Sequence, residues 1–220
     1  MAEPVIVTID GPAGVGKSTM AKRLARELSM PYLDTGAMFR AVARRLGDGA
    51  WERAEADLAS ALTGMEFSLS GIGEDSVLSL DGAPIGDEVR TEQVAMWGSN
   101  LAVLPVVRAS LKAAQQALGG RFSLVAEGRD MGSVVFPAAR RKFFLDATVD
   151  ERARRRLRQL TDMGKTADFD ELREQIARRD HQDRNRAEAP LKPAPDAVII
   201  DTTSLAIDEV FAALVRGVRG

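Results

Sequence analysis

The chain has 220 residues, 45% of them hydrophobic and 28% charged, so it is long enough to bury one full core with room for a small insertion. Its 30 Lys and Arg residues against 32 Asp and Glu leave a net charge of −2, which excludes a general electrostatic attraction to nucleic acid or membranes. The absence of cysteine and the single histidine, His181, exclude disulfides, cysteine-ligated zinc, thiol nucleophiles and His-rich metal sites.

Neither targeting nor membrane signals stand out in the sequence. The first residues, Met1 to Pro4, lack the basic segment of a secretory signal, and no apolar run approaches the ~18 residues of a membrane span. We therefore expect a cytoplasmic protein that binds no nucleic acid and no membrane.

Short apolar runs separated by helical periodicity predict an α/β fold. The runs cover residues 5–9, 30–33, 122–126, 143–145 and 197–200. Such runs are typical of a five-stranded parallel sheet with helices on both faces, which binds ligands at the carboxyl ends of its strands. Asp34, Glu127 and Asp146 each fall at such an end.

One segment interrupts this alternation. Residues 65–69 and 77–80 have the pattern of antiparallel strands, and Asp81-Gly82 supplies turn chemistry after them. We expect a small β-rich lobe over residues 64–90, inserted into a core formed by residues 1–63 and 91–220.

The first predicted strand runs directly into the P-loop pattern G-x-x-x-x-G-K-[ST]. The segment reads Gly11-Pro12-Ala13-Gly14-Val15-Gly16-Lys17-Ser18, and Thr19 continues it into a predicted helix. Here backbone N–H groups surround a phosphate, Lys17 reaches the β- and γ-phosphates, and the Ser18 hydroxyl holds Mg²⁺. A chance glycine-rich turn is the alternative, but the strand before the pattern and the helix after it favour a nucleoside triphosphate site.

Arginines are concentrated in two later predicted helices. The first contains Arg152, Arg154, Arg155, Arg156 and Arg158, and the second contains Arg173, Arg178, Arg179, Arg184 and Arg186. Two solvated charged faces would explain them, because acidic residues are interleaved. Beside a P-loop, however, arginines also supply the planar, permanent charge that neutralises a transferring phosphoryl group. Arg179, Asp183 and Arg186 share one helical face and suit a phosphorylated sugar.

Further segments, spread over nearly the whole chain, resemble the characteristic segments of a known protein family. They are Asp34-Thr35-Gly36-Ala37, Gly86-Asp87-Glu88-Val89-Arg90-Thr91, Glu127-Gly128-Arg129-Asp130-Met131-Gly132, Val135-Phe136-Pro137, Phe144-Leu145-Asp146-Ala147, and Arg184-Asn185-Arg186 before Ala189-Pro190-Leu191. With the P-loop, they make the chain resemble the bacterial cytidylate kinases of the P-loop nucleoside monophosphate kinase family. The resemblance implies a P-loop NTPase fold, a monomer, and Mg²⁺-dependent transfer of the γ-phosphoryl group of ATP to CMP or dCMP. It also makes the inserted lobe the CMP-binding domain.

The resemblance assigns roles residue by residue. Ser99, Arg108 and Asp130 match positions that recognise cytosine, and Thr35, Arg40, Arg129 and Arg186 match those that hold the acceptor phosphate. Asp183 matches the aspartate that contacts the sugar, and Arg179 a neighbouring arginine. The resulting catalytic set is Lys17, Arg129, Asp130, Arg155 and Arg186, with Arg152 and Arg156 beside ATP.

The segment 150–168 is expected to form a helical lid, with Gly164 at a helix break. An ordinary helix pair with a glycine cap is the alternative. Closure of a lid over the site would exclude water, to which the phosphoryl group could otherwise be transferred. No general base is needed, because the acceptor phosphate is already ionised at neutral pH.

Three residues depart from the family pattern. Thr35 stands where Ser is frequent, Phe39 where Tyr is common, and Glu127 where Asp is usual. Glu127 is expected to orient Mg²⁺ or its waters, or alternatively to pair with Arg129. Two rival functions also remain: another P-loop kinase acting on UMP, dTMP or a non-nucleotide, and a regulatory switch that binds a nucleoside triphosphate.

Overall fold

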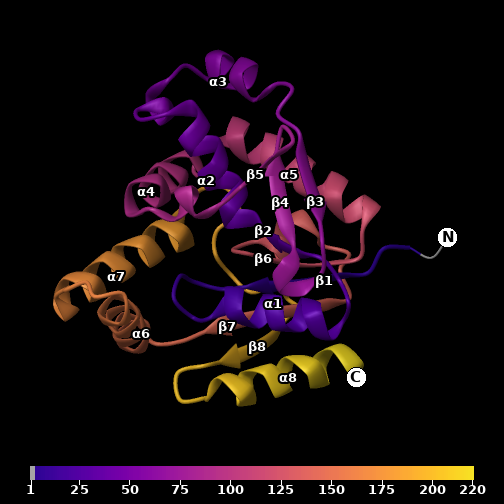
Figure 1. The fold of residues 1–220 in the computed structure, drawn as a ribbon, viewed down its shortest axis with the longest axis vertical. Coiled ribbons are helices and arrows are strands. Elements are labelled where there is room, and N and C mark those ends of the chain that lie inside the picture. The colour runs from indigo at the N-terminus through magenta and orange to yellow at the C-terminus, as the bar shows by residue number, and fades with distance from the viewer. Residues whose placement is uncertain (1–2) are drawn as a thin grey trace.

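Five parallel strands form the central sheet of the computed structural model, which describes residues 3–220 (Figure 1). The strands are β1 (Ile6–Asp10), β2 (Tyr32–Asp34), β6 (Leu124–Gly128), β7 (Arg141–Asp146) and β8 (Val198–Asp201). They lie in the order β2-β6-β1-β7-β8, and every neighbouring pair is parallel. The predicted five-stranded parallel sheet is therefore confirmed.

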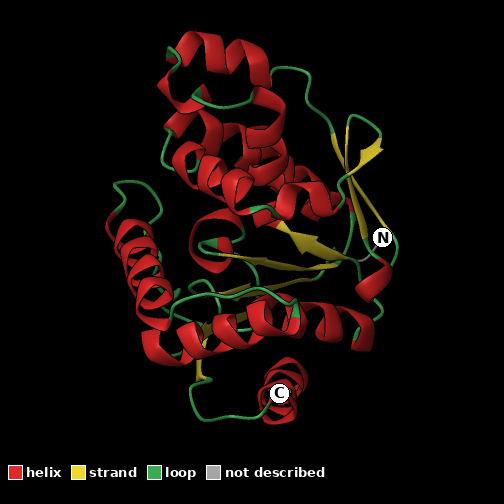
Figure 2. Cartoon of the chain, turned by 60° about the vertical axis from the view of Figure 1, so that its left-hand side comes forward, coloured by secondary structure: helices red, strands yellow, loops and turns green. Residues whose placement is uncertain are grey.

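Helices cover both faces of this sheet, because alternate strand residues point to opposite faces (Figure 2). Val7 and Ile9 of β1 pack in one core with α1 (Lys17–Glu27) and α8 (Ile207–Arg219). Leu124 and Ala126 of β6 pack in the other core. That core includes residues of α2 (Thr35–Leu46), α3 (Glu55–Leu62) and α5 (Pro105–Arg121).

The inserted segment forms a second, antiparallel sheet. Its strands are β3 (Phe67–Ser70), β4 (Val77–Leu80) and the short β5 (Ala83–Pro84). Leu69 and Leu78 are opposite each other in the β3–β4 register, and both are buried in the core that contains α2 and α5. The antiparallel strands expected over residues 65–80 are therefore confirmed, and they share the hydrophobic core of the main sheet.

Three short helical turns lie in and around the lobe. The first, η1 (Ala50–Glu52), precedes α3, while η2 (Gly73–Asp75) lies between β3 and β4 and packs on α1. The Gly73 N–H donates to the Met30 carbonyl at 2.9 Å, and the Ser76 hydroxyl accepts from the Tyr32 N–H at 2.8 Å. The third, η3 (Asp87–Arg90), leads into α4 (Glu92–Leu101), which packs on α2.

Helix α6 (Val149–Asp162) and the loop that follows it make up the segment 150–168 expected to form a lid, and α7 (Phe169–Asn185) packs against α6. Gly164 follows the end of α6 with φ of 73°, a conformation that glycine adopts without strain. The Gly164 and Lys165 N–H groups donate to carbonyls of Thr161 and Leu160, which closes α6. The helix break predicted at Gly164 is confirmed, while the movement of the segment 150–168 stays a prediction.

Within residues 3–220, no single helix has both the length and the apolar composition of a membrane span. Only α4 and α5 taken together have that length and apolar composition, and these two helices are bent by 101° relative to each other.

Candidate active site

A pocket of about 370 Å³ opens at the carboxyl edge of the sheet. Segments far apart in the sequence line it: the P-loop, the residues after β2 and β6, α4, and the α6–α7 pair. Most of the predicted site residues lie there, namely Ala13, Gly14, Lys17, Ser18, Thr35, Arg40, Ser99, Arg108, Glu127, Arg129, Asp130, Arg156, Arg179, Asp183 and Arg186. Further lining residues that the sequence did not assign to a role include Asp34, Arg90 and Gln159.

The P-loop turns sharply between β1 and α1. Gly11, Gly14 and Gly16 all have positive φ, and a Cβ on Gly11 would collide with the Leu145 carbonyl of β7. Helix α1 begins directly after this turn, and its first turn contains no acidic residue that would occupy the free N–H groups. These N–H groups and the helix dipole favour an anion at this point.

Lys17 is buried within the loop that precedes it. Its Nζ donates to the Pro12 carbonyl at 2.7 Å. Burial, together with the neighbouring charge of Arg129, lowers the pKa of Lys17 to about 7 despite the opposing effects of Glu127 and Asp10. A negatively charged phosphate in the pocket would restore the positive charge of this lysine.

Three arginines that line the pocket each have a buried donor without a hydrogen-bond partner among the described residues. Arg40 Nε, Arg179 Nε and Arg186 Nη2 are buried and have no hydrogen-bond partner among residues 3–220. Burial lowers the pKa of Arg179 to about 10, with Arg129 adding to the effect, and burial also lowers the pKa of Arg186. Buried unpaired donors are costly, so this cluster is suited to an anionic ligand that accepts several hydrogen bonds.

Asp34 and Thr35 fix the side of the pocket that follows β2. One Asp34 oxygen accepts from the Ala37 N–H at 2.8 Å and caps α2, while the other lies 3.1 Å from Arg40 Nη2 and 3.6 Å from Arg90 Nη2. The Thr35 hydroxyl donates to the Glu127 carbonyl at 2.7 Å. Asp34 therefore places two arginines at the mouth of the pocket.

The opposite end of the pocket contains a network of paired charges. Arg108 Nη2 donates to Asp130, whose other oxygen lies 3.6 Å from Arg186 Nη2. Arg129 Nε donates to Asp183 at 2.9 Å. Burial would raise the pKa of Asp183, but the charge and hydrogen bond of Arg129 outweigh it and lower that pKa. The Ser99 hydroxyl donates to the Ala95 carbonyl at 3.0 Å, so its oxygen can still accept a further bond.

Asp10, the last residue of β1, supports the turn that carries Arg129 and Asp130. Its carboxylate accepts from the N–H groups of Met131 and Gly132, both at 2.8 Å, at the start of the π-helical turn η4 (Met131–Val135). Burial raises the pKa of Asp10 to about 6. Asp10 is therefore a supporting residue behind the site.

Glu127, at the end of β6, is held by a tyrosine that the sequence did not indicate. The buried Tyr32 hydroxyl donates to Glu127 Oε1, and Arg129 pairs with Asp183, so the alternative pairing of Glu127 with Arg129 is wrong. Burial, with the nearby charge of Asp34, raises the pKa of Glu127, while Lys17 lowers it. The one signal in the sequence for this contact was that Glu127 stands where Asp is usual. The longer Glu side chain carries its carboxylate further from the backbone.

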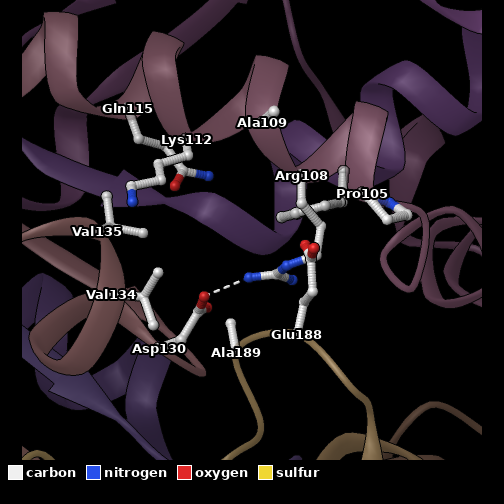
Figure 3. Close-up of a pocket in the computed structure, with 11 residues that line it drawn as sticks. Pro105, Arg108, Ala109, Lys112, Gln115, Asp130, Val134, Val135, Glu188 and Ala189 are labelled. Atoms are coloured by element: carbon white, nitrogen blue, oxygen red, sulfur yellow. Dashed lines mark hydrogen bonds and ion pairs between the residues drawn. The ribbon is translucent and has the colours of Figure 1, made fainter.

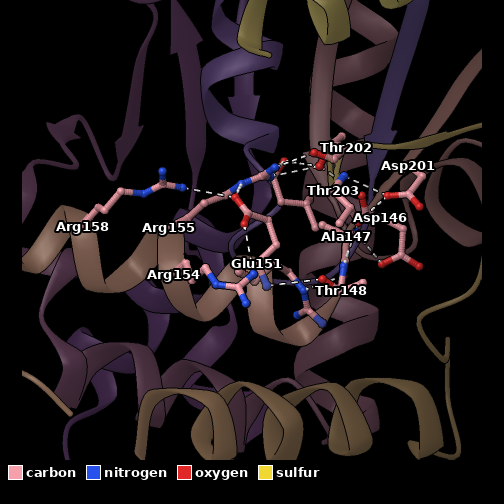
Figure 4. A network of polar contacts seen from close by, with 12 residues as sticks. Asp146, Ala147, Thr148, Glu151, Arg154, Arg155, Arg158, Asp201, Thr202 and Thr203 are labelled. Atoms are coloured by element: carbon pink, nitrogen blue, oxygen red, sulfur yellow. Dashed lines mark hydrogen bonds and ion pairs between the residues drawn. The ribbon is translucent and has the colours of Figure 1, made fainter. Parts of the chain in front are cut away.

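The arginines of α6 separate into different environments. Arg156 lines the pocket and donates to Glu92 at 3.2 Å. Arg155 points toward Thr202, the residue that follows β8. It donates to the Thr202 hydroxyl at 3.0 Å and to the Thr202 carbonyl at 2.5 Å (Figure 4). Arg152 is buried beneath the P-loop and bound to Asp180. The resemblance placed Arg155 in the catalytic set and Arg152 and Arg156 beside ATP, but of these three the structure brings only Arg156 to the pocket.

The metal donors next to the P-loop are few. No cluster of three or more His, Asp or Glu side chains within the described chain could hold a metal ion. Ser18 and Glu127 nevertheless line the same pocket and offer the hard oxygen atoms that Mg²⁺ prefers. Mg²⁺ commonly binds one or two such groups together with phosphate oxygens, so these two residues fit that ion.

The P-loop, the parallel sheet and the arginine-lined pocket together define a P-loop phosphotransferase. A solved structure of an uncharacterized protein from Eubacterium ventriosum shares the fold, with a TM-score of 0.52 over 99% of each chain at 12% identity.

The family model of the cytidylate kinases matches residues 7–219, and the chain belongs to that family. It is 60% identical to the cytidylate kinase of Maridesulfovibrio salexigens over 98% of this chain and 96% of that one. It is 59% identical to the cytidylate kinase of Oleidesulfovibrio alaskensis over the full length of both. The chain is accordingly an enzyme, and its family implies ATP as the phosphoryl donor and a nucleotide as the acceptor.

Proposed function

We propose that this enzyme transfers the γ-phosphoryl group of ATP to CMP or dCMP, giving ADP and CDP or dCDP. The observation that carries the proposal is one continuous pocket, with a P-loop at one end and Ser99, Arg108 and Asp130 at the other. The relatives that match over the whole chain are cytidylate kinases.

At the donor end, the P-loop N–H groups and Lys17 bind the phosphates of ATP. Ser18 and Glu127 hold Mg²⁺, which supplies charge neutralisation for the phosphates when bound. Arg156 is the arginine of α6 that we assign to the transferring group, because it lines the pocket. Movement of the lid segment 150–168 would bring Arg156 closer and exclude water.

At the acceptor end, Thr35, Arg40, Arg129 and Arg186 hold the phosphate of CMP. The unpaired donors on Arg40 and Arg186 support this assignment, because a phosphate oxygen accepts several charge-assisted bonds. Asp183 contacts the sugar hydroxyls, and Arg179 lies beside it with its own unpaired Nε. The inserted lobe contributes Arg90 at its carboxyl end, which lies 3.6 Å from Asp34 at the mouth of the pocket.

Cytosine recognition follows from hydrogen-bond complementarity. Asp130 accepts from the exocyclic amino group, while Arg108 and Ser99 pair with the ring nitrogen and carbonyl edge. Uracil presents a carbonyl where cytosine has the amino group, so it would face the Asp130 carboxylate and leave buried groups unpaired. Asp130 accepts from Arg108 and lies 3.6 Å from Arg186 Nη2, so its carboxylate is held in place at this end of the pocket.

Catalysis needs no general base here, because the attacking phosphate oxygen is already ionised. The residues act by positioning and by neutralising charge, with Lys17 and the arginines around the transferring group. We further propose that the enzyme acts as a cytoplasmic monomer without nucleic acid or membrane partners.

The test is Mg²⁺- and ATP-dependent ADP formation with CMP, dCMP, UMP, AMP, dTMP or no acceptor, each over a concentration series. Strong stimulation by CMP and dCMP alone supports the proposal. Preference for another acceptor would favour a different P-loop kinase. Slow hydrolysis independent of any acceptor would favour a regulatory switch and overturn the cytosine assignments.

A further inference from the structure

A second cavity of about 440 Å³ lies behind the cytosine-reading end of the active site (Figure 3). It is enclosed by α5, the π-helical turn η4 and the segment 188–189. Phe39, Arg108 and Asp130 line both this cavity and the active-site pocket. The Arg108–Asp130 ion pair therefore separates the active-site pocket from the second cavity. The volume of the second cavity falls in the range of small-molecule sites, roughly 300–1,000 Å³.

A buried polar group faces this cavity without a partner. Gln115 is only 1% exposed, and its Nε2 forms no hydrogen bond within residues 3–220. By contrast, Nε2 of the neighbouring Gln116 donates to the Val135 carbonyl at 2.9 Å. Because buried amide donors are nearly always paired, the Gln115 donor points to an acceptor that a ligand would supply.

The side chain of Lys112 adds a positive charge near the Gln115 amide. Lys112 is one turn earlier on α5, and Figure 3 shows both side chains reaching from that helix toward Val134 and Val135. Lys112 forms no ion pair within the described part of the chain, although it is half-buried. A ligand at this place would thus meet one hydrogen-bond donor and one positive charge.

The remaining walls are largely apolar. Pro105, Ala109, Val134, Val135 and the Phe39 ring form them, and such surfaces suit a flat hydrocarbon or heteroaromatic body. Glu188 also lines the cavity from the exposed segment after Arg186. Its charge disfavours a ligand with a second negative charge, such as a phosphate monoester.

We propose that this cavity is a second binding site for a small aromatic or heteroaromatic monocarboxylate. One carboxylate oxygen accepts from Gln115 Nε2, the Lys112 ammonium neutralises the charge, and the ring packs against Val134 and Val135. The ligand also contacts the Arg108–Asp130 pair from the side opposite the active site. If that pair reads cytosine, as proposed above, occupancy weakens CMP binding by drawing Arg108 from Asp130, and CMP weakens ligand binding equally.

Benzoate is the probe for the binding site itself. We expect saturable shifts of the Gln115 side-chain amide resonance in ¹⁵N-labelled protein during a benzoate titration. Benzamide lacks the charge and acetate lacks the ring, so each should bind about tenfold more weakly or worse. Absence of saturable shifts with benzoate would overturn the proposal, whatever the enzyme phosphorylates.

Matched variants localise the interaction. Lys112→Met should weaken benzoate binding by about tenfold, whereas Lys165→Met, the same change at an exposed lysine after α6, should leave it unchanged. Gln115→Met, which keeps the volume of the side chain, should also weaken binding. Equal benzoate affinity in the Lys112 and Lys165 variants would overturn the assignment.

The coupling is measured separately by kinetics. Benzoate should raise the KM for CMP without changing the KM for ATP, and Lys112→Met should remove this effect while leaving turnover without benzoate near the wild-type value. Saturable benzoate binding with an unchanged KM for CMP would overturn the coupling. Because the titration needs no turnover, a failure of the binding proposal is distinguishable from a failure of the CMP assignment.

Discussion

Arg152 and Asp180 form a buried bidentate ion pair that ties α6 to α7 directly under the P-loop. Arg152 Nη1 lies 2.9 Å from Asp180 Oδ1, and Nη2 contacts the other oxygen. The same guanidinium donates to the Ala13 carbonyl at 3.2 Å and to the Ala147 carbonyl at 3.0 Å. Arg152 is thus a positioning residue that connects the phosphate-binding loop to α7, and it lies within the segment 150–168 expected to act as a lid.

We expect Asp180→Asn to lower the free energy of unfolding by about 3–5 kcal/mol, because it leaves the buried Arg152 charge without its partner. The KM for ATP should rise more than the KM for CMP, since the P-loop loses its support. Urea unfolding and initial-rate kinetics measure the two effects.

The matched control is Arg154→Met on the exposed side of α6, where the Arg154 side chain is 60% exposed and lies 3.7 Å from Glu151. It should change stability by about 0–1 kcal/mol. If Asp180→Asn were as mild as this control, the supporting role of the pair would be wrong.

Lys17 should make ATP binding dependent on pH. Its pKa is lowered from 10.5 to about 7, so the free enzyme holds this lysine mostly uncharged at pH 8 and mostly charged at pH 6. Bound phosphates favour the charged form, and ATP binding should therefore take up a proton at pH 8 but scarcely at pH 6. The affinity for ATP should fall as the pH rises above about 7.

Calorimetric titration with ATP in two buffers of different ionisation enthalpy counts the protons taken up. Lys17→Met should abolish the proton uptake at pH 8, even where it weakens ATP binding. Equal proton uptake by the wild type at both pH values would contradict a lowered Lys17 pKa.

Tyr32→Phe should destabilise the fold by about 1–3 kcal/mol, because the buried Glu127 carboxylate loses its hydroxyl donor. It should also raise the Mg²⁺ concentration needed for half-maximal activity, since Glu127 is no longer held in one orientation. Thermal unfolding and a magnesium titration measure these changes. An unchanged magnesium requirement would separate Tyr32 from the metal and leave it a purely structural role.

Asp130→Asn should lower the preference for CMP over UMP by about 100-fold, measured as the ratio of the two kcat/KM values. The amide that replaces the carboxylate can donate to the uracil carbonyl, which the carboxylate repels. The KM for ATP serves as the internal control and should remain near the wild-type value. A preserved preference for CMP would remove Asp130 from base recognition.

Gly11→Ala should destabilise the protein by about 3 kcal/mol, because the added Cβ would collide with the Leu145 carbonyl at a backbone with φ of 147°. Gly120→Ala is the matched change within α5, where a Cβ meets nothing within 4 Å. It should stabilise the helix by about 0.5–1 kcal/mol. Equal melting temperatures for the two variants would contradict this reading of the P-loop turn.

The spacing of residues along the sequence was enough to predict the strands and turns, and the edge of the sheet at which the site lies. The apolar runs predicted all five parallel strands, and the P-loop glycines and Gly164 marked turns whose positive φ angles the structure confirms. These features depend on residues a few positions apart, where backbone sterics and side-chain period act directly.

Only the tertiary structure decided which side chains meet. Arg152, Arg155 and Arg156 follow one another closely in one helix, yet one lies under the P-loop, one binds Thr202, and one lines the pocket. The partners of Arg152 and of Tyr32 lie 28 and 95 residues away in sequence. The second cavity likewise depends on how α5 packs over η4. Such contacts depend on the packing of whole elements, because helical spacing fixes only the direction in which a side chain leaves its helix.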